Sequence, residues 1–178
     1  DLYAFYDVNS GNLVTNRYID YMGNWFYVGK DGKPVKGPRN IDGQDVFFNY
    51  RGVQAKGEFG QDGVYMPEYY YDKDNGRKVI EAGFVKDNRG LTYYLDEKGE
   101  KVLGLHEING DLYYFRQGGA YKYTQLGDMW HDSTNYIGDK IYYFDHEGKA
   151  VKNRFYQWGN DWYYFYADGT AATGEVQI

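Results

Sequence analysis

A short motif recurs along this chain: two or three aromatic residues are followed by a polar turn that closes on a glycine. It reads "LYYFRQGG" at 112–119, "IYYFDHEG" at 141–148 and "WYYFYADG" at 162–169. Successive closing glycines are 20 to 29 residues apart and mark eight units, at Gly11, Gly32, Gly52, Gly76, Gly99, Gly119, Gly148 and Gly169. A period of this length is typical of repeat architectures, so it constrains the fold more strongly than composition does.

Each unit has the pattern of a β-hairpin. Its aromatic stretch favours a strand, its glycine permits positive φ, and a short segment such as "KAVK" follows as a second strand. A lone hairpin is marginal in water and must bury its apolar face on neighbours. We therefore expect an all-β chain, a β-solenoid of stacked hairpins, forming one repeat domain over residues 1–178. Two stretches that break the spacing, 58–70 and 121–139, are expected to form loops.

Side chains alternate across a strand, so each aromatic stretch divides into two faces. The set that contains Tyr142 and Phe144 holds no charged residue and is expected to face inward. The other set pairs a first position that tolerates charge, such as Asp45, with a second position that is always Tyr or Phe. We expect these second-position rings to be partly solvated; they are Tyr27, Phe47, Tyr70, Tyr94, Tyr114, Tyr143 and Tyr164, with Trp162 at a first position.

Exposed flat rings at regular intervals suit the C–H faces of sugars, and repetition would convert weak contacts into useful avidity on a polymer. A structural reading of the same rings stays open. Aromatic pairs across strands stabilise sheets by roughly 0.2–1 kcal/mol each, with no ligand involved.

Composition excludes several classes of function. Lys and Arg, 20 in all, are scattered among 26 acids, which leaves no basic stripe for nucleic acid. No run of eighteen apolar residues could span a membrane, and no cysteine is present. The chain opens inside the repeat pattern without a signal peptide, so we expect it to be a fragment of a larger protein.

The sequence offers no constellation for catalysis, metal or cofactor binding. His106, His131 and His146 are assigned to different units without metal-ligand spacing. The "DKDNG" segment at 72–76 departs from the spacing of a calcium loop and is interpreted as a turn.

Four segments resemble the repeat regions of bacterial glucansucrases, within the wider superfamily of cell-wall-binding and choline-binding repeats. They are "GNWFYVGKDGKPVKG" (23–37), "IDGQDVFFNYRGVQAKGEF" (41–59), "INGDLYYFRQGG" (108–119) and "IGDKIYYFDHEGKAVKN" (137–153). The resemblance covers nearly the whole chain. It implies a non-catalytic, extracellular β-solenoid that binds α-glucan such as dextran in pockets between successive hairpins, with the parent protein a glucosyltransferase or a surface protein.

In that family a pocket pairs a tyrosine ring with polar side chains of a "GxQVKG" stretch. The resemblance therefore implies binding roles for Gln54 and Lys56, and in part for Lys36 and Lys152. Because Pro34 and Ala150 stand at the glutamine position of their units, only two or three pockets are expected.

Two alternatives remain. Attachment to choline or teichoic acid in a cell wall would need aromatic boxes built from a Gly-Trp dipeptide, and this sequence contains none. A purely structural solenoid spacer would keep the aromatic ladder without any ligand.

Overall fold

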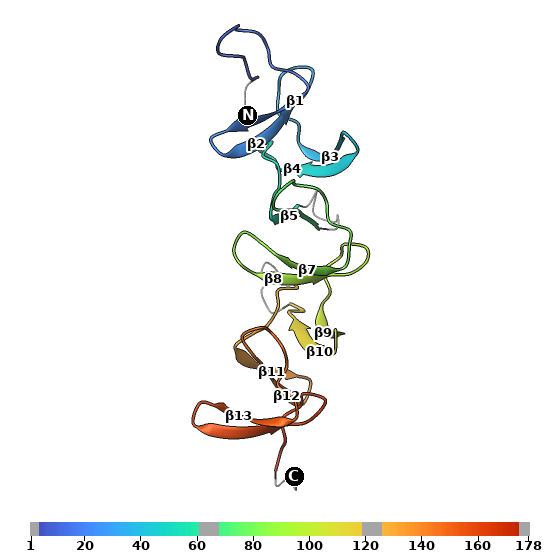
Figure 1. Cartoon of the computed structure of the whole chain (residues 1–178), viewed down its shortest axis with the longest axis vertical. Helices are drawn as coiled ribbons and strands as arrows, with labels where there is room; N and C mark the ends of the chain where they lie inside the picture. Colours follow the sequence, from blue (N-terminus) through green and yellow to red (C-terminus); the bar gives the residue numbers. More distant parts are fainter. Residues whose placement is uncertain (1–3, 61–67, 119–125, 175–178) are drawn as a thin grey trace. The chain divides into compact units, whose positions relative to one another are not determined.

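The computed structural model describes residues 4–60, 68–118 and 126–174, and within them every regular element is a β-strand (Figure 1). In these ranges, fourteen strands form seven two-stranded sheets. The prediction of an all-β chain built from hairpins is confirmed. The described residues hold no helix that could cross a membrane.

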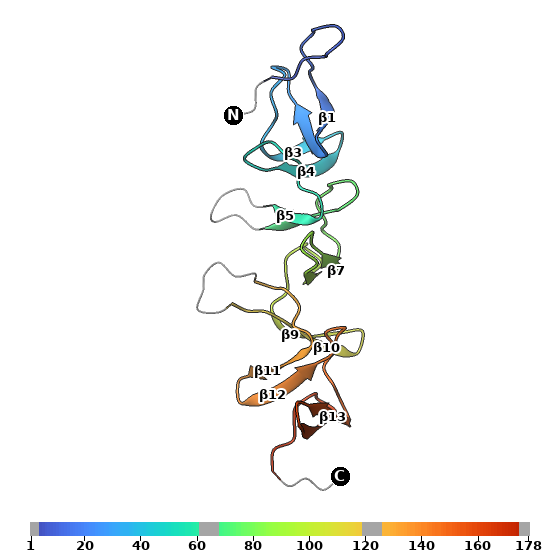
Figure 2. The ribbon, with the colours of Figure 1, turned by 90° about the vertical axis from the view of Figure 1, so that its left-hand side faces the viewer.

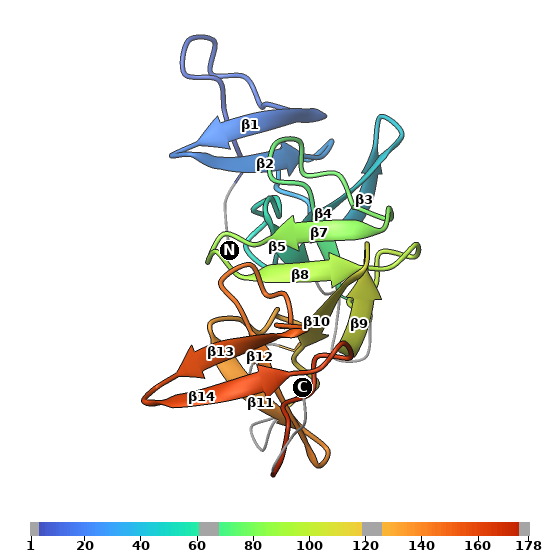
Figure 3. The same cartoon turned by 60° about the horizontal axis from the view of Figure 1, so that its bottom comes forward.

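Each sheet joins two strands that are consecutive in the chain, as seen for β11–β12 in Figure 2 and for β13–β14 in Figure 3. The chain divides into two compact units, residues 1–90 with 95–100 and residues 91–94 with 101–178. The pairs are β1 (Arg17–Tyr21) with β2 (Asn24–Val28), β3 (Gly37–Ile41) with β4 (Gln44–Phe48), β5 (Glu58–Gly60) with β6 (Tyr69–Tyr71), β7 (Gly83–Lys86) with β8 (Thr92–Leu95), β9 (Gly104–Ile108) with β10 (Asp111–Phe115), β11 (Ser133–Ile137) with β12 (Lys140–Phe144), and β13 (Arg154–Trp158) with β14 (Asp161–Phe165).

The main hairpins differ from those expected from the sequence. Each aromatic strand pairs with the strand before it, and in five of the seven pairs among the described residues a two-residue loop joins the strands. Both loop residues have positive φ in Met22-Gly23, Asp42-Gly43 and Asn109-Gly110, as type I′ turns require. Gly138 and Gly159, each with φ of 64°, begin two further loops. The twist of these tight turns matches that of the strands, so they form the hairpins.

The closing glycine of each unit has a different role from the one expected. Gly148 ends a turn in which its N–H donates to the carbonyl of Asp145 at 3.0 Å, and the Asp145 carboxylate accepts the N–H groups of Glu147 and Lys149, both at 2.9 Å. The segment after the turn does not form a second strand. It forms only a single β-bridge, between Phe144 and Ala150.

That short segment joins neighbouring hairpins. Three residues after the glycine, Val151 donates its N–H to the Tyr143 carbonyl of its own unit at 2.9 Å. The residue two positions after the glycine donates its backbone N–H to a carbonyl on the aromatic strand of the preceding hairpin. The five such bonds are Gln54 to Trp25, Lys78 to Asp45, Met129 to Thr92, Ala150 to Leu112, and Ala171 to Ile141, at 2.7 to 2.8 Å.

The sixth unit closes at a different glycine from the one predicted. Its closing glycine is Gly127 instead of Gly119, because Met129 bridges to Phe115 and Trp130 donates to the Tyr114 carbonyl. The stretch 121–139, expected to be a loop, supplies β11. In the other long stretch, 58–70, Glu58 pairs with Tyr71 and Gly60 with Tyr69. Positions 61–67 and 119–125, Gly119 among them, lie outside the described residues.

The expected inward face is confirmed. Phe144 and Phe48 are fully buried, and Tyr142 and Val46 are buried beside them. The same holds for the equivalent positions in other units: Phe26, Val28, Tyr93, Leu95, Tyr113, Phe115 and Phe165 are buried, and Tyr163 is half-buried.

Candidate functional site

A hollow of about 360 Å³ lies between the hairpins β3–β4 and β5–β6. It combines aromatic rings with charged and amide groups in one concave surface. We call it the Phe47 hollow; it is lined by Pro38, Arg39, Asn40, Asp45, Val46, Phe47, Gly60, Tyr69, Tyr71 and Lys78.

Strand alternation explains its aromatic wall. Phe47 lies on the outer face of β4, and Tyr71 lies on the inward face of β6 in the next unit. Their rings stack with centroids 5.7 Å apart and an interplanar angle of 30°. Gly60 fits against both rings, because a Cβ there would lie 2.6 Å from Phe47 Cδ1 and 2.8 Å from Tyr71 Cε2.

The polar rim comes from two hairpins. Asn40 stands opposite Asp45 in the β3–β4 register and donates its amide Nδ2 to the carboxylate Oδ1 at 2.8 Å. Lys78 Nζ lies 4.0 Å from the centre of the Tyr69 ring, and the Lys78 backbone N–H donates a hydrogen bond to the Asp45 carbonyl. A carboxylate acceptor and a cationic donor thus line one hollow together with aromatic rings. Such a mixture of polar and aromatic groups is typical of small-molecule sites.

A second hollow, of about 580 Å³, lies beside β2. Lys36, which the resemblance singled out, is one of its exposed lining residues. Tyr21 and Tyr50 contribute exposed rings, and the Arg51 guanidinium lies 5.3 Å from the Tyr50 ring centre.

The expectation that the second-position rings are solvated is wrong for three of them. Phe47, Tyr70 and Tyr143 are only 7%, 5% and 8% exposed. The reason is that the following hairpin covers this face: Phe47 stacks on Tyr71, and Tyr143 packs in one cluster with Phe165.

Tyr94 and Tyr114 are half-buried for the same reason. Tyr94 lies 6.3 Å from Phe115 and Tyr114 lies 6.3 Å from Phe144, centre to centre, each contacting an inward ring of the next unit. Tyr27 is half-buried against Tyr18 on the neighbouring strand, at 5.1 Å.

Tyr143 is the most constrained of these rings. Its hydroxyl accepts a hydrogen bond from Tyr156 at 3.1 Å, and the two ring centres are 4.2 Å apart. Burial beside this second phenol raises the pKa of Tyr143 to about 12. The side chain therefore belongs to the packing between hairpins.

Gln54, Lys56 and Lys152, three of the polar residues predicted from the sequence, form hydrogen bonds within the protein. Gln54 is 6% exposed, and its amide Nε2 donates to the Asn75 carbonyl at 3.5 Å. Lys56 Nζ donates to the Asp74 carbonyl, and Lys152 Nζ donates to the Gly110 carbonyl, both at 3.3 Å.

Trp162 is the most exposed aromatic side chain among the predicted binding residues. It is 64% exposed on β14, on the same face as the half-buried Tyr164. Phe155 lies opposite Tyr164 on β13, with ring centres 5.1 Å apart. This face therefore presents aromatic surface to solvent.

Several ring faces are occupied by cations of the chain itself. Lys56 Nζ lies 5.0 Å from the Trp25 ring centre, and the Arg116 guanidinium lies 5.1 Å from that of Trp130. Together with Lys78 on Tyr69, these contacts use the electron-rich faces that an external cation would need.

Sequence reasoning missed most of the polar rim: Arg39, Asn40, Tyr69 and Lys78. One signal was present, because Lys78 is the second residue after its closing glycine, as Gln54 is in its own unit. Asp45 was noted only as a tolerated charge. Its proximity to Lys78 depends on the hydrogen bond between successive hairpins, which the sequence pattern did not reveal.

Comparison with known families defines the class. Residues 35–82 match the choline-binding repeat, and residues 82–101 and 153–171 match a putative cell wall binding repeat. The chain belongs to the superfamily of choline-binding and cell-wall-binding repeats, as the resemblance implied.

Within that class, the chain is similar to streptococcal glucosyltransferases. It is 36% identical over 169 residues to glucosyltransferase-I of Streptococcus downei, covering 93% of this chain and 10% of the relative. It is 33% identical over 173 residues to glucosyltransferase-S of Streptococcus mutans serotype c, covering 94% of this chain and 11% of the relative. The chain thus spans about a tenth of the length of these relatives.

A solved structure supports the fold. Choline binding protein F of Streptococcus pneumoniae matches 92% of this chain and 49% of its own, with a TM-score of 0.57 at 22% identity. At this level of identity the likeness establishes a shared fold.

Proposed function

We propose that this chain is a non-catalytic module that binds α-glucan, of the dextran type, and tethers a glucosyltransferase or a surface protein to it. The observation that carries the proposal is the Phe47 hollow, which is lined by Asp45 and by Lys78, whose ammonium lies over the Tyr69 ring. The similarity along the chain to enzymes named for glucosyl transfer supports it.

The hollow has the properties of a sugar site. Its volume of about 360 Å³ falls in the ~300–1,000 Å³ range of small-molecule sites. Sugar hydroxyls both donate and accept, so one can donate to Asp45 while a neighbour accepts from Lys78 or Arg39. Tyr69 supplies the apolar edge for the ring C–H groups.

A polymer would contact the chain at more than one place. Trp162 and Tyr164 offer a second, flatter surface on β14, and Lys36 offers a third at the hollow beside β2. We propose that Tyr27, Phe47, Tyr94, Tyr114 and Tyr143 act by holding the hairpins at a fixed spacing, together with Gln54, Lys56 and Lys152. Contacts that are weak alone would then gain avidity on one polymer, by roughly 10²–10⁴-fold.

We further propose that the hairpins continue into one β-solenoid domain of eight units. The repeated bond from each closing segment to the preceding strand supports this arrangement within each compact unit. An extracellular location, associated with glucan or with the cell surface, follows from the proposed ligand.

Choline attachment is the second candidate, because the matched family carries that name. Lys56, Lys78 and Arg116 lie over the rings of Trp25, Tyr69 and Trp130. A quaternary ammonium would meet repulsion from these cations. We therefore favour a neutral polyhydroxylated ligand.

Affinity electrophoresis tests the proposal. The wild-type chain should be retarded in gels that contain dextran, and added choline chloride should not release it. Trp162→Ala should reduce retardation on the polymer while leaving affinity for a short isomaltooligosaccharide unchanged. Mobility unaffected by dextran, or release by choline, would contradict the proposal.

A further inference from the structure

The hairpin β11–β12 brings two histidines together. Its register pairs Ser133 with Phe144, and Asp132 continues the pairing by donating its N–H to the Asp145 carbonyl at 3.1 Å. One step further out, His131 and His146 stand opposite each other at the same end of the hairpin. The assignment of these two residues to different units is corrected, because they flank a single hairpin.

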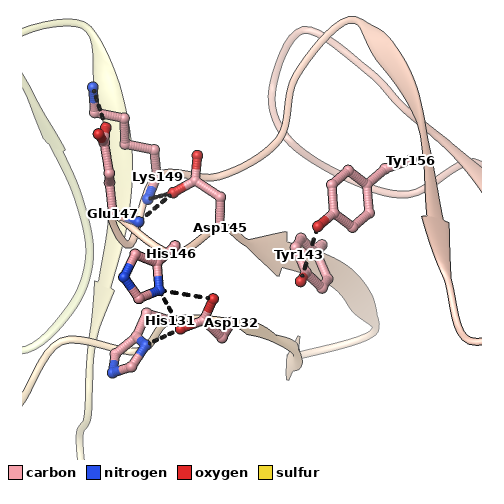
Figure 4. Close-up of polar contacts among 8 residues, drawn as sticks. All are labelled: His131, Asp132, Tyr143, Asp145, His146, Glu147, Lys149 and Tyr156. Atoms are coloured by element: carbon pink, nitrogen blue, oxygen red, sulfur yellow. Dashed lines mark hydrogen bonds and ion pairs between the residues drawn. The ribbon is translucent and has the colours of Figure 1, made fainter.

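Asp132 lies between the two imidazole rings. Its Oδ2 is 2.6 Å from Nδ1 of His131 and 3.0 Å from Nδ1 of His146, and both rings are directed toward the carboxylate in Figure 4. Asp132 has φ of 52°, a left-handed conformation that Asp adopts more readily than most residues. We call these three side chains the His131 cluster.

We propose that the His131 cluster binds a divalent transition-metal ion such as Zn²⁺, through one imidazole nitrogen from each histidine and a carboxylate oxygen. Two imidazoles and one carboxylate form a donor set that Zn²⁺ accepts readily. A water molecule or an added ligand would complete the tetrahedron.

The geometry is close to that of a bound ion. The three ligand atoms lie within 4.8 Å of one another. In a tetrahedral site with bonds of about 2.0–2.1 Å, ligand atoms are separated by roughly 3.3 Å. The two distances from Asp132 Oδ2, 2.6 and 3.0 Å, must therefore widen slightly. Side-chain rotation can supply this adjustment, because the three side chains are 47% to 91% exposed. The same exposure leaves the ion a direct path from solvent.

Neighbouring acids have other partners. Glu147 forms an ion pair with Lys149 at 3.2 Å, and the Asp145 carboxylate accepts backbone N–H groups of its own turn (Figure 4). Calcium would require more oxygen ligands than this cluster holds. A bound Zn²⁺ would connect His131, which precedes β11, to His146 in the turn after β12. It would therefore stabilise the open end of the hairpin.

Calorimetric titration of the whole chain with ZnCl₂ in metal-free buffer tests the proposal. The wild-type chain should bind one zinc ion per molecule. His131→Ala and His146→Ala should each weaken binding by about tenfold or more, because even the loss of a group that merely supports a ligand costs 10–100-fold. His106→Ala is the matched control and should leave the affinity unchanged.

Asp132→Asn provides a second variant, since Asn also tolerates positive φ but is a poorer ligand. It should weaken zinc binding while the circular dichroism spectrum without zinc stays that of the wild type. Absence of saturable binding, or equal affinity in the wild type, His131→Ala and His146→Ala, would overturn the proposal. Because the readout is zinc binding, the result is independent of glucan binding.

Discussion

At the scale of single residues, one position in each aromatic strand carries the packing between hairpins. Tyr94, Tyr114 and Tyr143 face the inward aromatic residue of the following unit, so the outer face is covered instead of solvated. Period-2 alternation correctly separated the two faces. It could not indicate what covers the outer one, because that depends on contacts more than twenty residues away.

Gly60 is a residue at which small size matters. Gly60→Ala would place a methyl group against Phe47 and Tyr71, so we expect the free energy of unfolding to fall by roughly 1–3 kcal/mol. Urea denaturation measures this loss. Gly29→Ala is the matched control, because its methyl would meet only ordinary contacts of 3.4 Å or more. Equal stability of the two variants would contradict the packing described for Gly60.

Tyr143 should titrate unusually late. Difference absorbance between the wild type and Tyr143→Phe isolates one phenol, and its midpoint should lie near the raised pKa of about 12. A pKa above the unfolded value of about 10 means that the folded chain holds the proton more tightly. This contribution to stability is complete below pH 10 and is lost as the pH rises toward 12. A midpoint near 10 would show that the phenol is not buried.

At the scale of elements, the short segment after each closing turn connects one hairpin to the one before. Sequence reasoning predicted the repeat and its β-structure, but expected this segment to be a strand of the hairpin. The pattern was misinterpreted because both turns carry glycine, and only the two-residue loops such as Asn109-Gly110 have the twist that a hairpin favours.

Removing one connecting N–H tests this role. Ala150→Pro deletes the hydrogen bond to the Leu112 carbonyl, and we expect a loss of at least about 1–3 kcal/mol in the free energy of unfolding. Ala167→Pro is the control, because it occupies the second position of the turn that Gly169 closes, where proline is favoured. Thermal or urea unfolding that failed to distinguish the two would argue against the connecting role of this segment.

At the scale of the whole molecule, the candidate binding surface could be predicted only in part. The family resemblance and the exposed Trp162 were available from the sequence, but the rim around Asp45 and Lys78 was not. Those two residues belong to different units and meet because the Lys78 N–H bonds to the Asp45 carbonyl. Conversely, Gln54 carries the expected motif yet lies buried under the turn at 72–76.

The most direct measurement is a calorimetric titration with an isomaltooligosaccharide. The wild type should bind, and Lys78→Ala and Asp45→Ala should each weaken binding roughly tenfold, since losing a hydrogen bond to a charged group costs about 1.5–3 kcal/mol. Lys98→Ala, an exposed lysine in another turn, is the control and should bind as the wild type does. Undiminished binding by both Lys78→Ala and Asp45→Ala, or no binding by the wild type, would contradict the assignment of the Phe47 hollow as the glucan site.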